Sequence, residues 1–344
     1  METIRNRLVD VRQERSEEEK NIENQIILLK KDGDEPNLND GKALEDLPDW
    51  FDEEKFKRGQ EFFKLNYFSL FVSKLSGLLV ILSIPRVLKI LTMTEKSATP
   101  ELAFKRYLNT LRHMLMWYNG NVLDKESWAY KSLKLVHAKH TAANRRGMTK
   151  NIGSLSQSSL AITQFGFMGF GLLMPEKLGV VVRDEKDMEG FIHFWRVIGY
   201  LLGVDEEHNI CNGTVEETKE TCKRLLEEIL WPHLKAPSKE FIDMTRTVIN
   251  GMWAMVPFLD FEGFMAFTYD LSNLNVSPFT NIWSQTIYNF QKFVHQRLRD
   301  KIFGNLWRIF FNFQMWLSVV LSSRFPLFAY ISFGSMKSSH VEMY

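Results

Sequence analysis

The sequence of 344 residues contains very little cysteine. Cys211 and Cys222 are the only two, and they do not form a C-x-x-C pair. A disulfide framework or a cysteine-based zinc or iron–sulfur site would need more cysteines than these. The first residues, METIRNRLVDVRQERSEEEKN, also lack the apolar core of a secretory signal. Both observations predict an intracellular protein.

The chain has no excess of either charge. It contains 43 Lys and Arg and 42 Asp and Glu, for a formal net charge of +1. A nucleic-acid interface needs a concentrated basic surface, so we expect no nucleic-acid partner. The phosphate loop G-x-x-x-x-G-K-S/T, a strand-borne G-x-G-x-x-G, the G-x-S-x-G elbow and H-E-x-x-H are missing as well. Their absence excludes the commonest NTPases, dehydrogenases, hydrolases and zinc proteases.

Long uncharged runs are also missing. The run from Leu75 to Pro85 is far shorter than the roughly 20 apolar residues that a membrane-spanning helix needs, and it predicts a buried core helix. A second run, from Ile309 to Ser323, is followed by Arg324 and is short for a span. It suits either an interfacial helix with peripheral membrane contact or a terminal helix docked on the core, and both interpretations stay open.

The chain is rich in apolar and aromatic residues, which make up 45% and 13% of it, and these recur at helical spacing from Trp50 onward. The stretch TPELAFKRYLNTLRHMLMWY illustrates the pattern. Thr99 and Pro100 are typical of a helix start, and Asn119 with Gly120 are typical of its end. No hairpin signal, internal repeat or heptad run is present. The sequence therefore predicts an all-α fold.

The composition divides the chain into three segments. Residues 1–45 are charged and poor in large apolar side chains, which predicts a flexible or docking arm. Residues 46–300 form the predicted helical domain. Residues 301–344 form an apolar C-terminal helical segment, which is the candidate for membrane contact.

The stretch SLKLVHAKHTAANRRG sets His137 and His140 one helical turn apart. Three interpretations fit: histidines packed in the core, a metal pair that would need a third protein ligand, or one axial ligand of a haem with small Ala138 beside it. The residues alone favour packing and leave the other two open. Arg106 and Thr110 are four residues apart, so they share a helix face and could address one ligand.

Three blocks resemble the rubber oxygenase family, which includes latex-clearing and ER-bound oxygenases. They are RYLNT at Arg106–Thr110, KLVHA at Lys134–Ala138 and GFIHFWRVIGYLLGVDEEHN at Gly190–Asn209. The stretch LAITQFGFMGFGLLMPEKLGV between the last two is also similar. The resemblance implies one large helical domain whose globin-like core, with extra helices around it, holds a haem b. It implies that His137 is the iron ligand and that Lys134 and Arg145 help to bind the cofactor.

The implied activity is O₂ activation by haem iron and oxidative cleavage of a C=C bond in a lipophilic, isoprenoid substrate. Arg106, Asn109 and Thr110 would set the polarity of the pocket, and an association with the endoplasmic reticulum membrane is implied for part of the family. Asn109 and Thr141 depart from the lysine and the arginine usual in the latex-clearing members. These departures keep an alternative open, a non-catalytic helical haem-binding or scaffold protein that retains the fold.

Overall fold

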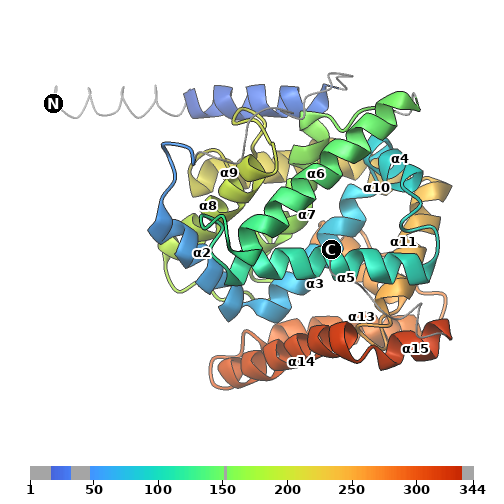
Figure 1. Ribbon diagram of the computed structural model, residues 1–344. Helices are drawn as coiled ribbons and strands as arrows, with labels where there is room; N and C mark the ends of the chain where they lie inside the picture. Colours follow the sequence, from blue (N-terminus) through green and yellow to red (C-terminus); the bar gives the residue numbers. More distant parts are fainter. Residues whose placement is uncertain (1–16, 32–46, 151–152, 335–344) are drawn as a thin grey trace.

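The computed structural model describes residues 17–31, 47–150 and 153–334, and these ranges contain helices and no strand (Figure 1). The predicted all-α class is confirmed. The helices α2 to α8 are Glu53–Leu65, Tyr67–Ile81, Pro85–Met93, Pro100–Asn119, Trp128–Thr149, Gln157–Leu173 and Glu185–Leu201. After them come α9 (Val215–Arg224), the π-helix η1 (Leu225–Leu230), α10 (Trp231–Lys235), α11 (Lys239–Met252), α12 (Phe261–Leu271), α13 (Ile282–Arg297), α14 (Gly304–Arg324) and α15 (Leu327–Phe333).

Two pairs of helices, α2 with α8 and α3 with α7, pack most closely and form the centre of the molecule. Each pair crosses at two glycines. A methyl group at Gly59 would overlap the carbonyl oxygen of Gly190, and one at Gly77 would overlap the carbonyl oxygen of Gly166. Glycine is therefore required at Gly59 and Gly77, because only it lets the two backbones approach so closely.

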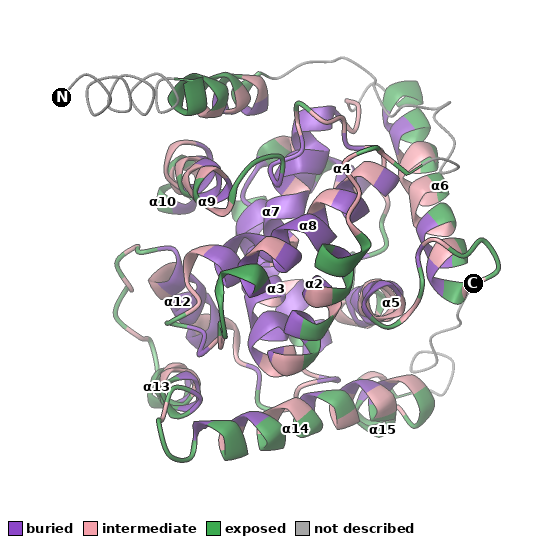
Figure 2. Cartoon of the chain, turned by 90° about the vertical axis from the view of Figure 1, so that its left-hand side faces the viewer, coloured by how far each residue is buried: buried purple, intermediate pink, exposed green. Residues whose placement is uncertain are grey.

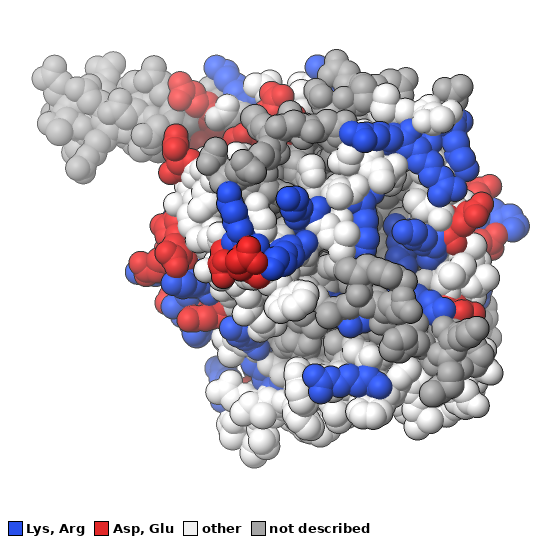
Figure 3. Space-filling view, in the orientation of Figure 1, with Lys and Arg blue, Asp and Glu red and all other residues white. Residues whose placement is uncertain are grey.

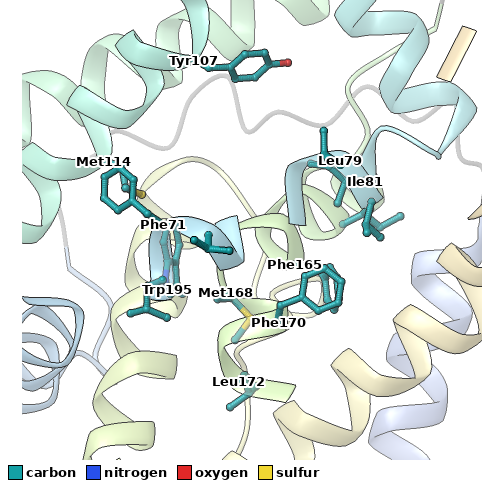
Figure 4. Packing of buried hydrophobic residues seen from close by; sticks show 14 of the residues in the cluster. Phe71, Leu79, Ile81, Tyr107, Met114, Phe165, Met168, Phe170, Leu172 and Trp195 are labelled. Atoms are coloured by element: carbon teal, nitrogen blue, oxygen red, sulfur yellow. The ribbon is translucent and has the colours of Figure 1, made fainter. Parts of the chain in front are cut away.

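The apolar run that begins at Leu75 lies in α3 and the turn after it. Figure 2 shows that α3 and α7 are buried almost throughout, and in Figure 4 buried residues of α3, α7 and α8 point into one cluster. Within the described ranges no single helix is long and apolar enough to cross a membrane. Two pairs reach that length and composition only when joined across bends, α2 with α3 at 94° and α14 with α15 at 61°.

Helix α5 begins and ends where the sequence predicts. The hydroxyl of Thr99 accepts a hydrogen bond from the backbone N–H of Leu102, and Pro100 occupies the first helical position. The helix ends at Asn119, and the N–H of Gly120 closes its last turn. The ends of α5 matter for function because this helix carries the Arg106 block.

Residues 17–30 of the predicted arm form a helix, while residues 1–16 and 32–46 lie outside the described part. Ile26 and Leu29 of this helix are fully buried. The Gln25 side chain donates a hydrogen bond of 3.0 Å to the carbonyl of Asn209. This segment is therefore docked on the helical domain.

Helix α14 lies along one edge of the molecule (Figure 1), and polar contacts join it to α2, α3 and the loop after α7. The amide oxygen of Asn312 accepts from the N–H of Phe68 at 2.9 Å, and its nitrogen donates to the carbonyl of Leu65 at 2.9 Å. The buried Arg308 donates to the carbonyl of Gly179 at 2.9 Å. The inner side of α14 is therefore fixed to the core.

Candidate functional site

A cavity of about 1580 Å³ lies between α3, α5, α6, α7, α8 and α14. Its wall is largely apolar, and α5 and α6 contribute both of its histidines and several of its other polar residues. Some side chains that line the cavity are also exposed at the surface, so the cavity opens among them. These are Phe258, Phe290, Leu321, Phe325, Leu327 and Phe328.

The polar residues predicted on α5 lie in the cavity wall. Arg106, Asn109 and Thr110 all line it. Arg106 donates to the hydroxyl of Thr94 at 2.9 Å, and the Thr110 hydroxyl donates to the carbonyl of Arg106 at 3.1 Å. The amide oxygen of Asn109 is buried without a hydrogen-bond partner. A buried acceptor of this kind is costly unless a ligand donates to it.

The two histidines of α6 differ in their surroundings. His140 lines the cavity, and its Nδ1 atom is buried without a hydrogen-bond partner. Burial, together with His137 and Arg106, lowers the pKa of His140 to about 4, so its imidazole is neutral near pH 7. His137 is partly buried and is not among the lining residues. Of the two histidines of α6, His140 is therefore the one that lines the cavity.

A third histidine, His113 of α5, lines the same wall. Its Nδ1 atom lies 2.8 Å from the hydroxyl of Ser132, while its Nε2 atom is buried without a partner. Burial and the nearby Lys139 and Arg112 lower its pKa to about 4. The facing sides of α5 and α6 thus present unpartnered polar atoms to an otherwise apolar cavity.

Lys134 and Arg145, which the resemblance implies as cofactor-binding residues, are exposed and do not line the cavity. Their role stays a prediction. The basic residues that do line it on this side include Lys105, Arg106 and Lys139. Burial lowers the pKa of Lys139. These side chains are better placed than Lys134 and Arg145 to meet an anionic group in the cavity.

Sequence reasoning missed Lys74, which lines the cavity from α3 and is only 5% exposed. Its Nζ atom lies 4.8, 5.4 and 5.7 Å from the ring centres of Phe63, Tyr118 and Trp195. Its one hydrogen bond is long, 3.5 Å to the carbonyl of Leu70. Among the described residues it forms no ion pair. The signal in the sequence was a single lysine in a stretch whose other residues are apolar or have small side chains.

Burial lowers the pKa of Lys74 well below its ordinary value. A desolvated cation over aromatic rings gains about 2 kcal/mol, whereas burying an unpaired ammonium costs several kcal/mol. The cost of burial outweighs the attraction of the rings. Burial therefore makes the neutral amine more accessible at Lys74 than at an exposed lysine.

The described residues contain no cluster of three or more His, Cys, Asp and Glu side chains that could hold a metal ion. Both cysteines are free and buried. The chemistry available in the cavity is therefore that of two neutral imidazoles, a guanidinium and several amides, hydroxyls and amines.

Comparisons with known proteins assign the chain to a family. The family described as "ER-bound oxygenase mpaB/B'/Rubber oxygenase, catalytic domain" matches residues 65–320. These residues include α3, α5, α6, α7 and α8, which form the cavity. The chain belongs to this family of oxygenases, as the three sequence blocks predicted.

The fold is similar to that of a solved structure titled "Structure of Latex Clearing Protein LCP in the closed state". The two share 17% sequence identity, with a TM-score of 0.52 over 81% of this chain and 77% of that chain. This likeness concerns the fold. A comparison with curated proteins finds no match.

Proposed function

We propose that the protein is a haem b-dependent oxygenase whose prosthetic group lies in the cavity between α5 and α6. The observation that supports it is the neutral imidazole of His140, whose Nδ1 atom is buried without a hydrogen-bond partner, with the unpartnered amide oxygen of Asn109 in the same wall. A flat apolar group with acidic edges fits a largely apolar wall in which Lys105, Arg106 and Lys139 would pair with the acidic edges.

In this proposal a histidine of α6 would hold the iron. The resemblance implies His137, while the cavity lining favours His140, and the experiment below separates them. When bound, the group supplies iron on which O₂ can be activated. Arg106 is held by Thr94, Thr110 is held by the α5 backbone, and together with Asn109 they fix the polarity of the pocket beside a substrate.

The proposed substrate is a lipophilic molecule of the isoprenoid class, and the proposed reaction is oxidative cleavage of a C=C bond. Apolar side chains that line the cavity, such as Phe71, Leu75, Leu78 and Phe167, would hold a hydrocarbon chain and exclude water. Lys74 is the basic residue in this part of the wall, and burial lowers its pKa.

Haem titration tests the proposal on the purified full-length protein. We expect a Soret band at one equivalent of haem b, and a large loss of affinity in one of the variants His137→Ala and His140→Ala. His233→Ala, which changes a histidine outside the cavity, is the matched control and should bind normally. Absence of a Soret band in the wild-type protein would overturn the haem proposal.

Oxygen consumption with isoprenoid hydrocarbons then separates the oxygenase from the alternative, a non-catalytic haem-binding or scaffold protein. Asn109 is the observation that favours the alternative, because the latex-clearing pattern has a lysine there. We expect consumption that depends on substrate and falls in Arg106→Ala. A protein that binds haem but consumes no oxygen with any isoprenoid would support the alternative.

We also propose that the protein contacts a membrane peripherally, at the endoplasmic reticulum that the family description names. A surface rich in exposed aromatic and aliphatic side chains supports this, and we call it the C-terminal apolar face. It consists of Trp283, Phe290, Phe293, Leu306, Ile309, Phe310, Phe313, Trp316, Leu321, Phe325, Leu327, Phe328, Tyr330 and Ile331.

Monomeric soluble proteins rarely expose so many large apolar residues together. In Figure 2 the outer sides of α13 and α14 are exposed, and the face shown in Figure 3 has few charged side chains along the edge that α14 forms. Phe325, Leu327 and Phe328 belong both to this face and to the cavity lining. A lipophilic substrate could therefore pass from lipid into the cavity without crossing water.

A further inference from the structure

Lys74 is a buried nucleophile for which the proposed oxygenase chemistry has no use. It stands on α3 and lines the same cavity as the polar residues of α5 and α6. The rings of Phe63, Tyr118 and Trp195 surround its amine, and Trp195 also lines the cavity. No carboxylate of the described residues pairs with it.

We infer that Lys74 is a covalent binding residue for lipophilic aldehydes and ketones, which it holds in the cavity as an imine. An amine on an apolar wall, walled off from water by aromatic rings, keeps the lone pair that attacks a carbonyl carbon. The other α3 residues on this wall, such as Phe71 and Leu78, would contact the hydrocarbon part of the ligand. The site therefore recognises an aldehyde or ketone carbonyl joined to an apolar chain.

The chemistry balances without an oxidant or a reductant. The Nζ lone pair of Lys74 forms a bond to the carbonyl carbon, and the carbonyl oxygen takes up a proton to give a carbinolamine. Loss of the second amine proton and of the hydroxyl group as water then leaves the C=N bond of the imine. Addition of water reverses both steps and releases the carbonyl compound.

This inference does not rest on the proposed function, because the imine forms without haem. The two are connected by their chemistry, since cleavage of a C=C bond leaves carbonyl groups on both fragments. An amine in the same cavity could retain one of these fragments. It could equally accept a lipophilic aldehyde that arrives from elsewhere.

Reductive trapping tests the inference. The full-length protein is incubated at pH 7 with citronellal, an isoprenoid aldehyde whose double bond is not conjugated with its carbonyl group. It is then reduced with sodium borohydride, digested and analysed by mass spectrometry. Each unit by which a lysine pKa falls raises the neutral fraction about tenfold near pH 7. We therefore expect the alkylated fraction of Lys74 to exceed that of exposed lysines at least about tenfold.

The controls use the same cavity. Lys105 also lines it but pairs with Glu101 at 3.0 Å and is partly exposed, so its labelling should match that of surface lysines. Squalene, which has no carbonyl group, should compete for the cavity and suppress labelling at Lys74 alone. Lys74→Met should remove the preferred adduct and leave the labelling of all other lysines unchanged.

Equal labelling of Lys74 and exposed lysines, or labelling that squalene does not affect, would overturn the inference. Both results are obtained on the wild-type protein, so they do not depend on the folding of a variant. A Soret band without labelling of Lys74 would refute this inference and leave the haem proposal standing. Labelling of Lys74 without a Soret band would support this inference and refute the haem proposal.

Discussion

Asp187 is the buried carboxylate that joins the start of α8 to α2. It is fully buried and accepts hydrogen bonds from Arg58 Nε at 2.6 Å and Arg183 Nη2 at 2.7 Å. Burial alone would raise its pKa, but the hydrogen bonds from Arg183 and Arg58 outweigh burial and hold the pKa below its ordinary value of 3.8. The ionised form therefore stabilises the fold above that pH.

We expect Asp187→Asn to lower the free energy of unfolding by about 2–4 kcal/mol at pH 7, because two arginines lose a buried partner. A carboxylate with a lowered pKa contributes its stability above its unfolded pKa and loses it as pH falls through the folded pKa. The difference between variant and wild type should therefore shrink on going from pH 7 to pH 3, as measured by urea denaturation.

Asp184→Asn provides the matched control. Asp184 contacts the same Arg58 at 2.9 Å, but its side chain is 53% exposed. Its loss should cost no more than about 1 kcal/mol, from a weakened exposed ion pair, because asparagine also accepts the N-cap hydrogen bond of α8. If the cost of Asp187→Asn were the same at pH 3 as at pH 7, the ionised pair would not be its cause.

Part of the candidate site could be predicted residue by residue. Arg106 and Thr110 share a face by their spacing, and the structure places both in the cavity wall with Asn109. His137 and His140 are three residues apart, or about 60° around a helix, which is too little for a sequence to tell which one faces the cavity. That choice depends on how α6 is rotated against its neighbours.

At the scale of single elements, the sequence predicted what local chemistry decides. Thr99 and Pro100 begin α5 for two reasons. The Thr99 hydroxyl accepts a hydrogen bond from a backbone N–H of the first turn, and the Pro100 ring holds φ near its helical value. The close contact of Gly77 with Gly166 could not be predicted, because it depends on which two helices meet. For the same reason, the burial of Lys74 follows from the packing of α3 and not from its own sequence.

We expect Gly77→Ala to destabilise the protein by about 1–3 kcal/mol or more, because the new methyl group would overlap the carbonyl oxygen of Gly166 and force α3 and α7 apart. Gly166→Ala is the control at the same crossing. Its methyl group would meet the Cδ1 atom of Ile81 at 3.0 Å, and this end of a flexible side chain can move. Chemical denaturation of both variants measures the difference, and equal losses would contradict this account of the crossing.

At the scale of the whole molecule, the C-terminal apolar face predicts binding to lipid. We expect the protein to sediment with phosphatidylcholine vesicles. The double variant Phe310→Glu and Phe313→Glu should bind about tenfold or more weakly, because it removes two large apolar contacts and adds two charges. The fraction bound at increasing lipid concentration measures the effect.

Trp128→Glu is the matched control, because Trp128 is 76% exposed but lies at the start of α6, outside the C-terminal apolar face. It should bind vesicles as the wild type does. Equal weakening by both changes would mean that lipid does not distinguish this face from other exposed aromatic residues. Normal circular dichroism of each variant would show that the helices are retained.

Because Asn312 and Arg308 fix the inner side of α14 to the core, its outer side can exchange water for an apolar medium without the helix detaching. This has a practical consequence for purification. A detergent that coats α14 and α15 also meets Phe325, Leu327 and Phe328, which line the cavity. Detergent tails therefore compete with any lipophilic ligand, so affinities should be measured in lipid nanodiscs or without detergent.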